Sequence, residues 1–286
     1  MIRRRPDCFR IVSDTNVRPS GCTVEIVAHR GASIEAPENT RAAVELAWQL
    51  RADAVEIDVQ LSRDGHLAVI HDESLKRTAN VESLVGDLLM SDLQKVDVGA
   101  WKGNQWRGET LVELPDILAT IPPGRRLFVE LKSDGSSEAS QAIITALQRD
   151  LLNTAIAPES VVLISFYPAL LRAARESLPQ FEAFLVVQQE PVSTEPTGTG
   201  SGSMSWQPSI KEIIDTAVRS GFHGVDLSNT EALTREAITS IRQANLTSCV
   251  WTVNSPDDAH RLADAGIDSI TTDDPRNLRA ALLQQA

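Results

Sequence analysis

Residues 24–78 read VEIVAHRGASIEAPENTRAAVELAWQLRADAVEIDVQLSRDGHLAVIHDESLKRT. Within this stretch, residues 54–62 and 66–71 alternate between apolar and polar side chains on either side of Asp64-Gly65. Asp-Gly between two such runs is typical of a β-hairpin, here with these two residues as the loop. The register that follows places Arg63 opposite His66, Leu61 opposite Ala68, Val59 opposite Ile70, and Asp58 opposite His71.

This register sorts the side chains of the hairpin into two faces, because directly opposed residues share a face of the ribbon. Glu56, Asp58 and His71 fall together on one face, which brings two carboxylates and an imidazole close to one another. The other face is apolar and consists of Ile57, Val59, Leu61, Ala68 and Ile70.

The length of the chain and its composition suit one barrel of alternating strands and helices. The chain has 286 residues, of which 42% are hydrophobic, and a single (β/α) barrel commonly has about 250 residues. Residues 1–22 show no clear period and are expected to form an extension of uncertain order. We expect residues 23–286 to form the barrel as a single domain.

Several observations favour a cytoplasmic protein without a membrane anchor. No apolar run approaches the length that a membrane-spanning helix needs, and no continuous apolar segment follows the basic residues at the N-terminus, so we expect no secretory signal. Cys8, Cys22 and Cys249 are odd in number and fit no metal-ligand spacing, which suits a reducing compartment. Pairing of Cys8 with Cys22 would require an oxidising one.

The net charge of −12 argues against partners with polyanionic surfaces. Nucleic acid and anionic lipid both require a basic patch that releases counterions, so neither is expected as a partner, and stable membrane insertion is not expected either. A small anionic substrate would need local cations, namely a bound metal and a few Arg or Lys side chains. The sequence carries no signal for an oligomeric state.

From residue 24 onward, apolar strands alternate with amphipathic helical segments. This order predicts parallel strands with right-handed crossovers, and eight such units close a TIM (β/α)8 barrel, with a small hairpin excursion after the second strand. Shorter helices are expected at 91–96 and 114–119. The expected strands are 24–29, 54–59, 127–132, 161–166, 183–187, 224–227, 248–253 and 269–272, and the expected helices are 40–50, 138–152, 168–177, 210–220, 235–243, 257–265 and 275–283.

Residues 188–209 interrupt this alternation. Their sequence, QQEPVSTEPTGTGSGSMSWQPS, is rich in Gly, Ser, Thr and Pro and cannot bury a core of its own. The segment follows the fifth barrel strand, on the side where the loops of an active site lie. A mobile lid and an inert disordered insertion are both compatible with this composition.

The strand parity directs a set of ionisable side chains into the barrel. In the second strand the apolar side chains face the helices, so Glu56 and Asp58 point inward. The same parity in LFVELK places Glu130 and Lys132 inward, and His29 ends the first strand on its inner face. The inner face at the C-terminal ends of the strands is where a (β/α) barrel builds its active site.

These side chains predict a metal site that binds a phosphate group. Glu56, Asp58 and Glu130 supply hard oxygen ligands, which Mg²⁺ or Ca²⁺ prefers, with Mn²⁺ as a further option. Together with Arg30 and Lys132, the cation makes a positive pocket in an acidic protein. Two histidines across that pocket, His29 and His71, can act as an acid–base pair.

The residues that carry these features also carry a resemblance to a known family. In their order along the chain, from about residue 24 to residue 278, they resemble the glycerophosphodiester phosphodiesterase family. The matching motifs are His29-Arg30-Gly31-Ala32-Ser33, Pro37-Glu38-Asn39-Thr40, Glu56-Ile57-Asp58-Val59, His71-Asp72 with Leu75 and Arg77-Thr78, Glu130-Leu131-Lys132, Ser165-Phe166, Trp251-Thr252-Val253-Asn254 and Thr272-Asp273-Asp274-Pro275.

The resemblance implies a TIM barrel that hydrolyses glycerophosphodiesters, such as glycerophosphocholine or glycerophosphoethanolamine, to an alcohol and sn-glycerol 3-phosphate. It also implies roles for particular residues: His29 and His71 as the catalytic pair, Glu56, Asp58 and Glu130 as ligands of one divalent metal, and Arg30 and Lys132 as phosphate-binding residues. Ser62, Arg77-Thr78-Ala79, the N-terminal extension and the 188–209 insertion depart from the family pattern, and the insertion leaves the substrate preference open.

Two other functions remain to be tested against the structure. A lysophospholipid or sphingolipid substrate would require an apolar groove at the mouth of the barrel, which the polar insertion does not suggest. A non-catalytic protein that binds a phosphorylated ligand would have no use for two histidines. Which histidine acts as the base, and whether the 2-hydroxyl of the substrate or water attacks phosphorus, are both left open.

For the remaining histidines, aromatic residues and polar residues near the site, the sequence predicts structural roles or leaves two roles open. His66, His223 and His260 are expected to be structural. Asn39 precedes a helix, where capping and substrate contact are equally compatible with its position. Trp251 and Phe166 border the glycerol moiety or simply pack, and Asp72 orients either a loop or a histidine.

Overall fold

The computed structural model describes residues 24–133, 135–193 and 204–283. Its centre is a closed barrel of eight parallel strands, because β1 pairs with β2 on one side and with β11 on the other. The predicted TIM barrel is confirmed. The barrel strands are β1 (Glu25–His29), β2 (Ala54–Leu61), β4 (Arg126–Leu131), β5 (Val161–Ser165), β6 (Glu182–Val187), β9 (Gly224–Ser228), β10 (Thr247–Trp251) and β11 (Ser269–Thr272).

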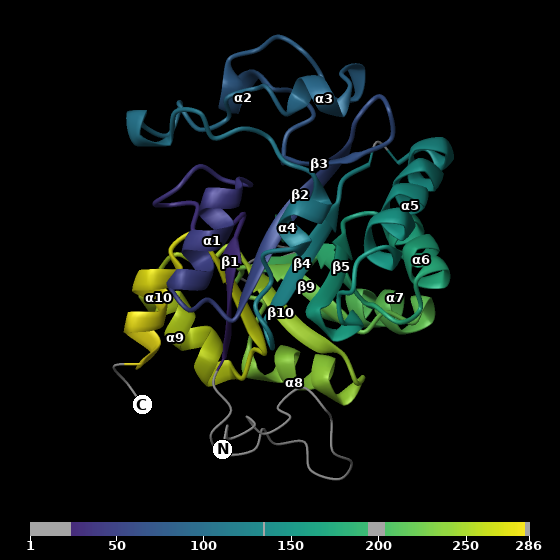
Figure 1. Ribbon diagram of the computed structural model, residues 1–286. Coiled ribbons are helices and arrows are strands. Elements are labelled where there is room, and N and C mark those ends of the chain that lie inside the picture. Colours follow the sequence, from purple (N-terminus) through teal and green to yellow (C-terminus); the bar gives the residue numbers. More distant parts are fainter. Residues whose placement is uncertain (1–23, 134, 194–203, 284–286) are drawn as a thin grey trace.

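Helices surround the barrel, as Figure 1 shows from the side. Hydroxyl side chains cap the N-termini of several of these helices; Thr40, Ser136 and Ser255, for example, each accept a hydrogen bond from the amide three residues later. Their apolar faces pack on the outside of the strands. The helices of this layer are α1 (Arg41–Gln49), α4 (Leu114–Leu118), α5 (Ser137–Leu152), α6 (Pro168–Ser177), α7 (Ile210–Ser220), α8 (Arg235–Gln243), α9 (Pro256–Ala265) and α10 (Pro275–Leu283).

The strands separate two apolar regions, which accounts for their alternating sequence. Val55, Ile57 and Val59 belong to the large cluster between the strands and the helices. The intervening residues of β2, Glu56 and Asp58, therefore face the lumen, as predicted. A smaller cluster fills the lumen itself and consists of Val27, Ala54, Phe128, Val162, Ile164, Phe184, Val186 and Cys249.

An ion pair lies at the N-terminal end of the lumen. The Arg126 guanidinium donates to both carboxylate oxygens of Glu25, at 2.9 and 2.5 Å, and stacks 5.1 Å from the centre of the Phe128 ring. Glu182 accepts a further hydrogen bond from Arg126 at 3.3 Å, and the Ser269 hydroxyl donates to Glu25 at 2.6 Å. Every charge in this group therefore has a partner at hydrogen-bonding distance.

The hairpin after β2 has a register that differs by one residue from the prediction. Its return strand β3 (Leu67–Val69) places Leu67 opposite Leu61 and Val69 opposite Val59. The loop has three residues, because the Ser62 amide donates to the His66 carbonyl and Gly65 takes a positive φ of 78°. Ile70, rather than His71, consequently lies opposite Asp58, and its amide donates to the Asp58 carbonyl.

This shift moves Ala68 and Ile70 to the opposite face from the one predicted. There they join Leu75, Leu93 and neighbouring residues in a third apolar cluster. The cluster supports an excursion over residues 72–113, which lies above the barrel in Figure 1 and includes α2 (Lys76–Ala79) and α3 (Met90–Leu93). The predicted small hairpin is therefore the base of a larger excursion with a core of its own.

The 188–209 insertion is anchored at both ends. The first and last parts of the insertion pair with each other as antiparallel strands, β7 (Glu190–Ser193) with β8 (Met204–Gln207). The Gln189 amide donates to the Ser228 hydroxyl, and its side-chain amide donates to the Pro208 carbonyl. The middle of the insertion and the predicted 1–22 extension lie outside the described residues. Among the helices that the structure describes, none has the length and apolarity to cross a membrane.

Candidate active site

Three buried carboxylates meet at the C-terminal end of the lumen. Parallel register brings His29 beside Glu56 and Asp58 beside Glu130 on neighbouring strands. Glu56, Asp58 and Glu130 are 4%, 0% and 8% exposed, and each offers an oxygen within 4.8 Å of the others. The sequence predicted this group correctly, because all three residues follow the inward parity of their strands.

Lys132 lies next to this group. Its ammonium nitrogen is 2.9 Å from Asp58 Oδ1 and 2.5 Å from Glu130 Oε1, and 5.9 Å from the centre of the Phe166 ring. Burial opposes its charge, but the two carboxylates raise the pKa of Lys132 above its usual value. The ammonium group is therefore held positive at the edge of the carboxylate group.

The three carboxylates repel one another. Burial, and then the charges of Asp58 and Glu130, raise the pKa of Glu56 well above its usual value. Burial and Asp58 raise the pKa of Glu130 to about 7. Burial acts in the same direction on Asp58, but Lys132 and Arg30 prevail and hold the pKa of Asp58 well below its usual value.

The group fits a hard divalent cation. Glu56 Oε1 is buried, and no hydrogen-bond donor among the described residues reaches it, which leaves this oxygen free to act as a ligand. Three converging carboxylates are the donor type that Mg²⁺ and Ca²⁺ prefer. Without a cation, the cost of keeping them ionised together appears as the raised pKa values of Glu56 and Glu130.

Arg30 reaches the same group through an unusual backbone conformation. It has a positive φ of 55°, and Gly31 one of 84°. In this turn the Arg30 amide donates to Glu56 Oε2 at 3.0 Å, and its Nε lies 3.2 Å from Asp58 Oδ2. Gly31 cannot be replaced without strain, because an added Cβ would lie 2.6 Å from the carbonyl carbon of Ala43.

His29 is oriented by the loop that follows the last strand. Its Nδ1 lies 2.7 Å from Asp273 Oδ1, and since a carboxylate only accepts, Nδ1 carries the hydrogen. Asp273 also accepts from Ser33 and from Asn254, at 3.1 and 2.7 Å. Burial opposes ionisation of Asp273, but these hydrogen bonds lower its pKa to about 2. The His29 Nε2 faces the carboxylate group, 3.9 Å from Glu56 Oε2.

His71 has a matching arrangement from the other side. Its Nδ1 lies 2.6 Å from Asp72 Oδ1, which answers the open question about Asp72: it orients the histidine. Burial lowers the pKa of His71, although Asp58 and Asp72 oppose this change. The imidazole is therefore neutral at pH 7 and able to accept a proton.

Asn39 has a role that the sequence did not indicate. Thr40, not Asn39, caps α1. The Asn39 side chain donates to Asp58 Oδ2 at 2.8 Å and accepts from the Asp58 amide at 3.1 Å. The Asn39 backbone has a positive φ of 58°, a conformation that Asn adopts more readily than most residues. Asn39 therefore fixes the orientation of Asp58.

Glu38 and Arg77 were also left without a role in the sequence. Glu38 Oε1 accepts from Arg30 at 2.9 Å, and both Glu38 oxygens accept from Arg77. Both residues lie within motifs that carry the family resemblance, Pro37-Glu38-Asn39-Thr40 and His71-Asp72 with Leu75 and Arg77-Thr78, and this membership was the only available signal. Asp273 likewise lies within the Thr272-Asp273-Asp274-Pro275 motif, whereas for Asp72 the sequence left open whether it orients a loop or a histidine.

A fourth carboxyl group, that of Asp226, faces the lumen from β9. Its neighbours Val225 and Leu227 belong to the outer cluster, and Asp226 is 3% exposed. No described donor reaches Asp226 Oδ1. Burial, and then the charge of Glu130, raise its pKa to about 8, so the group is mostly protonated at pH 7.

A groove of about 830 Å³ opens beside His71 and Lys132. One part of its wall is polar and includes Gln60, Glu73 and Asp87. The other part is apolar and includes Leu61, Leu84, Val85, Ile143, Phe166 and Tyr167. The groove is far larger than a phosphate group, and its walls suit a substituent with both polar and apolar parts.

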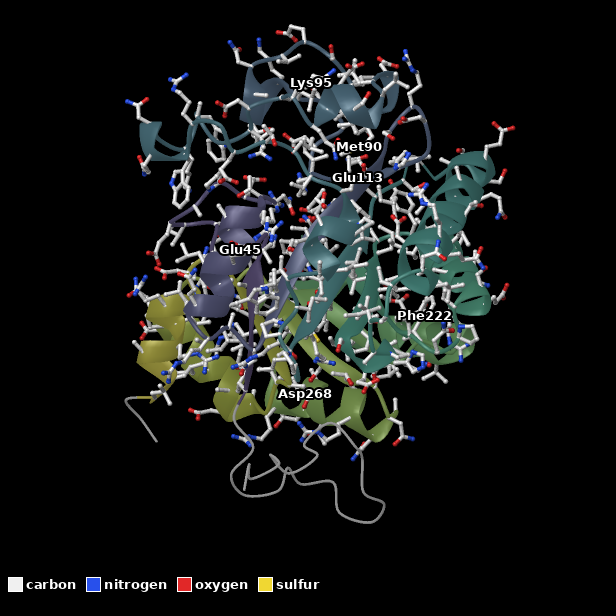
Figure 2. All side chains as sticks on the ribbon, viewed as in Figure 1. Glu45, Met90, Lys95, Glu113, Phe222 and Asp268 are labelled. Atoms are coloured by element: carbon white, nitrogen blue, oxygen red, sulfur yellow. The ribbon has the colours of Figure 1, made fainter. Side chains whose placement is uncertain are left out.

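The other histidines are structural, as predicted. His66 pairs with Glu113 at 3.0 Å, His223 accepts from the Ala183 amide, and His260 contacts the Ala281 carbonyl. Trp251 packs edge-on against Phe166, with ring centres 5.5 Å apart. Figure 2 shows all described side chains on the ribbon.

The model of the glycerophosphoryl diester phosphodiesterase family matches residues 29–277. The chain belongs to this family. It is therefore a phosphoric diester hydrolase that acts on glycerophosphodiesters. The matched region runs from the first histidine of the site to α10 and includes every residue of the carboxylate group.

Relatives in this family match over most of their length. The glycerophosphodiester phosphodiesterase of Caldanaerobacter subterraneus is 31% identical over 259 residues, which are 88% of this chain and 95% of that protein. The glycerophosphodiester phosphodiesterase of Bacillus subtilis is 30% identical, over 87% of this chain and 83% of that protein. An Oleispira antarctica phosphodiesterase, solved in complex with the product sn-glycerol-3-phosphate, aligns with a TM-score of 0.75 and 26% identity, over 90% of this chain and 96% of that one.

Proposed function

We propose that the enzyme hydrolyses small glycerophosphodiesters such as glycerophosphocholine and glycerophosphoethanolamine, in a metal-dependent reaction, to an alcohol and sn-glycerol 3-phosphate. The observation that carries this proposal is the arrangement of two His–Asp pairs on either flank of three buried carboxylates. The product complex of the Oleispira antarctica relative supports sn-glycerol 3-phosphate as a product here.

Glu56, Asp58 and Glu130 would hold one divalent cation, Mg²⁺ or Ca²⁺, with Mn²⁺ as a further option. When bound, such a cation polarises a phosphoryl oxygen and offsets the charge that develops during phosphodiester cleavage. Arg30 and Lys132 border the same space and would bind the remaining phosphate oxygens, since both are held positively charged.

His29 and His71 would divide the proton transfers between them. In each ring Nδ1 donates to an aspartate, Asp273 or Asp72, which leaves Nε2 as the nitrogen that exchanges a proton with the substrate. One histidine removes the proton of the attacking hydroxyl, and the other protonates the departing alkoxide. Either order is compatible with this symmetric arrangement.

The attacking group is the 2-hydroxyl of the glycerol moiety, which closes a cyclic phosphate that water then opens, or it is water itself. A glycerophosphodiester that lacks the 2-hydroxyl separates the two routes. Full activity on this substrate supports direct attack by water, whereas loss of activity together with a trapped cyclic phosphate supports internal attack.

The groove beside His71 favours an alcohol group with positive charge. The carboxylates of Glu73 and Asp87 border it, and neither is engaged in an ion pair among the described residues. A choline or ethanolamine group could contact the negative charge of these carboxylates and the aromatic rings of Phe166 and Tyr167. These contacts support the cationic head groups named above.

The apolar part of the groove also favours a second candidate substrate, a lysophospholipid or sphingolipid. The polar insertion did not suggest an apolar groove, but Leu84, Phe166 and Tyr167 are 48%, 38% and 40% exposed on the wall of this one. Initial rates on lysophosphatidylcholine and on glycerophosphocholine, compared below the micellar concentration, separate the two substrates. A higher kcat/KM for glycerophosphocholine supports the small substrate.

Release of glycerol 3-phosphate from glycerophosphocholine, with and without a chelator, tests the proposal. We expect activity to disappear with the chelator and to return on addition of Mg²⁺, Ca²⁺ or Mn²⁺. Normal turnover by metal-free enzyme would contradict the assignment of the carboxylates. Absence of turnover with metal, combined with tight binding of glycerol 3-phosphate, would favour a non-catalytic binding protein.

We further propose that residues 23–286 form one catalytic domain, with residues 1–22 as an extension, and that the protein acts in the cytoplasm. The free and buried thiol of Cys249 is consistent with a reducing compartment. We do not expect nucleic acid as a partner, because the chain has a net charge of −12.

A further inference from the structure

Arg77 joins the excursion over residues 72–113 to the loop after β1. Its Nη1 and Nη2 donate to the two oxygens of Glu38, at 2.7 and 2.8 Å. Its Nε and Nη2 also donate to the two oxygens of Asp72, at 2.7 and 3.1 Å. A single guanidinium therefore makes two-bond contacts with two carboxylates from separate parts of the fold.

Each of these carboxylates also contacts a residue of the proposed machinery. Asp72 Oδ1 lies 2.6 Å from the His71 Nδ1, and Glu38 Oε1 accepts from the Arg30 guanidinium at 2.9 Å. Arg30 in turn reaches Asp58. An unbroken series of polar contacts thus runs from His71 through Asp72, Arg77 and Glu38 to Arg30.

We propose that Arg77 is a positioning residue for the reaction. By holding Asp72 and Glu38 at once, it orients His71 for proton transfer and Arg30 for phosphate binding. The inference rests on the proposed function, since it takes the roles of His71 and Arg30 from there. It also gives the excursion a function in catalysis, because the docked excursion carries Arg77.

The geometry separates this arrangement from an ordinary surface ion pair. Exposed pairs commonly contribute little, since solvent screens them and long side chains lose entropy. Arg276 and Glu35 form such a pair, in which Nε and Nη2 of Arg276 donate to the two oxygens of Glu35 at 2.9 and 3.0 Å. Neither residue is bonded to a proposed catalytic group. Arg77 has comparable side-chain exposure, 43% against 54%, and differs in what its partners hold.

The planar fork of arginine is required for this role. Lysine carries one compact charge and cannot bond two carboxylates in the same two-bond geometry. Loss of residues that orient a catalytic group typically lowers activity by about 10- to 100-fold. We expect this range for Arg77→Met, and a smaller loss for Arg77→Lys, which retains the charge and one of the contacts.

The test compares full-length Arg77→Met and Arg77→Lys with Arg276→Met as the matched control. Steady-state kinetics on glycerophosphocholine with saturating Mg²⁺ give kcat and KM separately, inhibition by glycerol 3-phosphate gives the product affinity, and thermal melting gives stability. We expect Arg77→Met to lower kcat/KM about 10- to 100-fold and to weaken product binding, with a melting temperature similar to that of Arg276→Met. Arg77→Lys should recover part of the activity.

Two further variants test the branches separately and remain informative if Arg77→Met does not fold. Asp72→Asn interrupts the branch to His71, so we expect it to lower kcat with little change in product affinity. Glu38→Gln weakens the branch to Arg30, so we expect the KM and the inhibition constant to rise. In nitrogen NMR spectra, loss of the Nδ1–H tautomer signal of His71 in Arg77→Met would support the orienting role.

The outcomes distinguish the inference from the proposed function. If the unmodified enzyme shows no metal-dependent release of glycerol 3-phosphate, the proposed function is wrong whatever Arg77 does. If that activity is present, but Arg77→Met stays within about twofold of Arg276→Met in kcat, KM and product affinity, the proposal for Arg77 is overturned on its own. Equal loss of activity and of stability in Arg77→Met, with no rescue by lysine, also overturns it.

Discussion

The two ends of the barrel lumen hold similar side chains in opposite electrostatic states. At the N-terminal end, Arg126 occupies both oxygens of Glu25, and Ser269 adds a third hydrogen bond. At the C-terminal end, three carboxylates face one another, and an oxygen of Glu56 has no described donor. Complete pairing at one end stabilises the fold, whereas incomplete pairing at the other leaves ligands available for a cation.

The difference follows from which residues the strands bring together. The N-terminal end has one guanidinium among its acidic residues, and burial of Arg126 is outweighed by Glu25, so the pKa of Arg126 rises. At the C-terminal end the pKa values of Glu56 and Glu130 rise instead, because burial and like charges act together. In barrels of this type, residues at the C-terminal end carry function and those at the N-terminal end carry stability.

The largest effect is expected for Glu56→Gln. The amide removes one anionic ligand, so metal affinity should fall, and kcat/KM should drop about 1,000-fold or more as the cation's stabilisation of the transition state is lost. Metal titration by calorimetry and glycerol 3-phosphate release measure the two effects. Retained activity with unchanged metal affinity would show that the unpaired oxygen of Glu56 has no ligand role.

His71→Ala should affect chemistry without affecting the metal. Loss of a general acid or base lowers kcat by about 100- to 10,000-fold, while the three carboxylates remain in place. The same calorimetric titration should therefore give nearly the wild-type metal affinity. A parallel loss of metal affinity would mean that the imidazole takes part in holding the cation or the carboxylates.

Glu25→Gln makes the same chemical change at the opposite end of the lumen. It removes the main partner of a buried guanidinium, which costs about 3 kcal/mol of unfolding free energy. Urea unfolding measures this loss, and kcat/KM at 25 °C should stay within about twofold of wild type. A large loss of activity in a folded Glu25→Gln variant would contradict the claim that the N-terminal end of the lumen contributes to stability and not to catalysis.

The last comparison concerns Asp226→Asn, measured as stability against pH with chelator present. The pKa of Asp226 is raised to about 8 by burial and by Glu130, so between its unfolded value and pH 8 the folded state binds one more proton than the unfolded state. The contribution of this group to stability therefore falls as pH rises through this window, by at most about 1.4 kcal/mol per pH unit.

Asn carries no titrating proton, so the Asp226→Asn variant should be more stable than wild type by a margin that grows from pH 4 to pH 8. Thermal melting at unit pH steps measures this margin. A margin that does not change with pH would show that Asp226 is ionised in the folded protein.

The sequence predicted the barrel and the carboxylate group because both follow from strand parity. An apolar residue at every second position of β2 leaves Glu56 and Asp58 only the lumen, and β4 repeats the pattern for Glu130. The hairpin register was wrong by one because Asp64-Gly65 suits loops of two or three residues. The Ser62 hydroxyl accepts from the His66 amide and favours the longer loop, a local side-chain contact that alternation does not reveal.

The partners of the site residues could not be predicted for a different reason. Asp273 is 244 residues from His29, and its side chain follows a strand end, where parity no longer applies. Asn39 contacts Asp58 from a backbone with a positive φ of 58°. Orientation in loops depends on backbone angles and distant neighbours, so motifs place such residues near the site without giving their contacts.

Closure of the ring by β1 and β11 has a consequence for synthesis. While the chain emerges from the ribosome, one edge of β1 lacks its partner until residue 272 is available, and domains generally complete folding only once their long-range contacts can form. The carboxylate that orients His29 follows one residue later. A nascent chain therefore gains its barrel and the orientation of its first histidine in the same late step, and a chain that stops short of this point has neither.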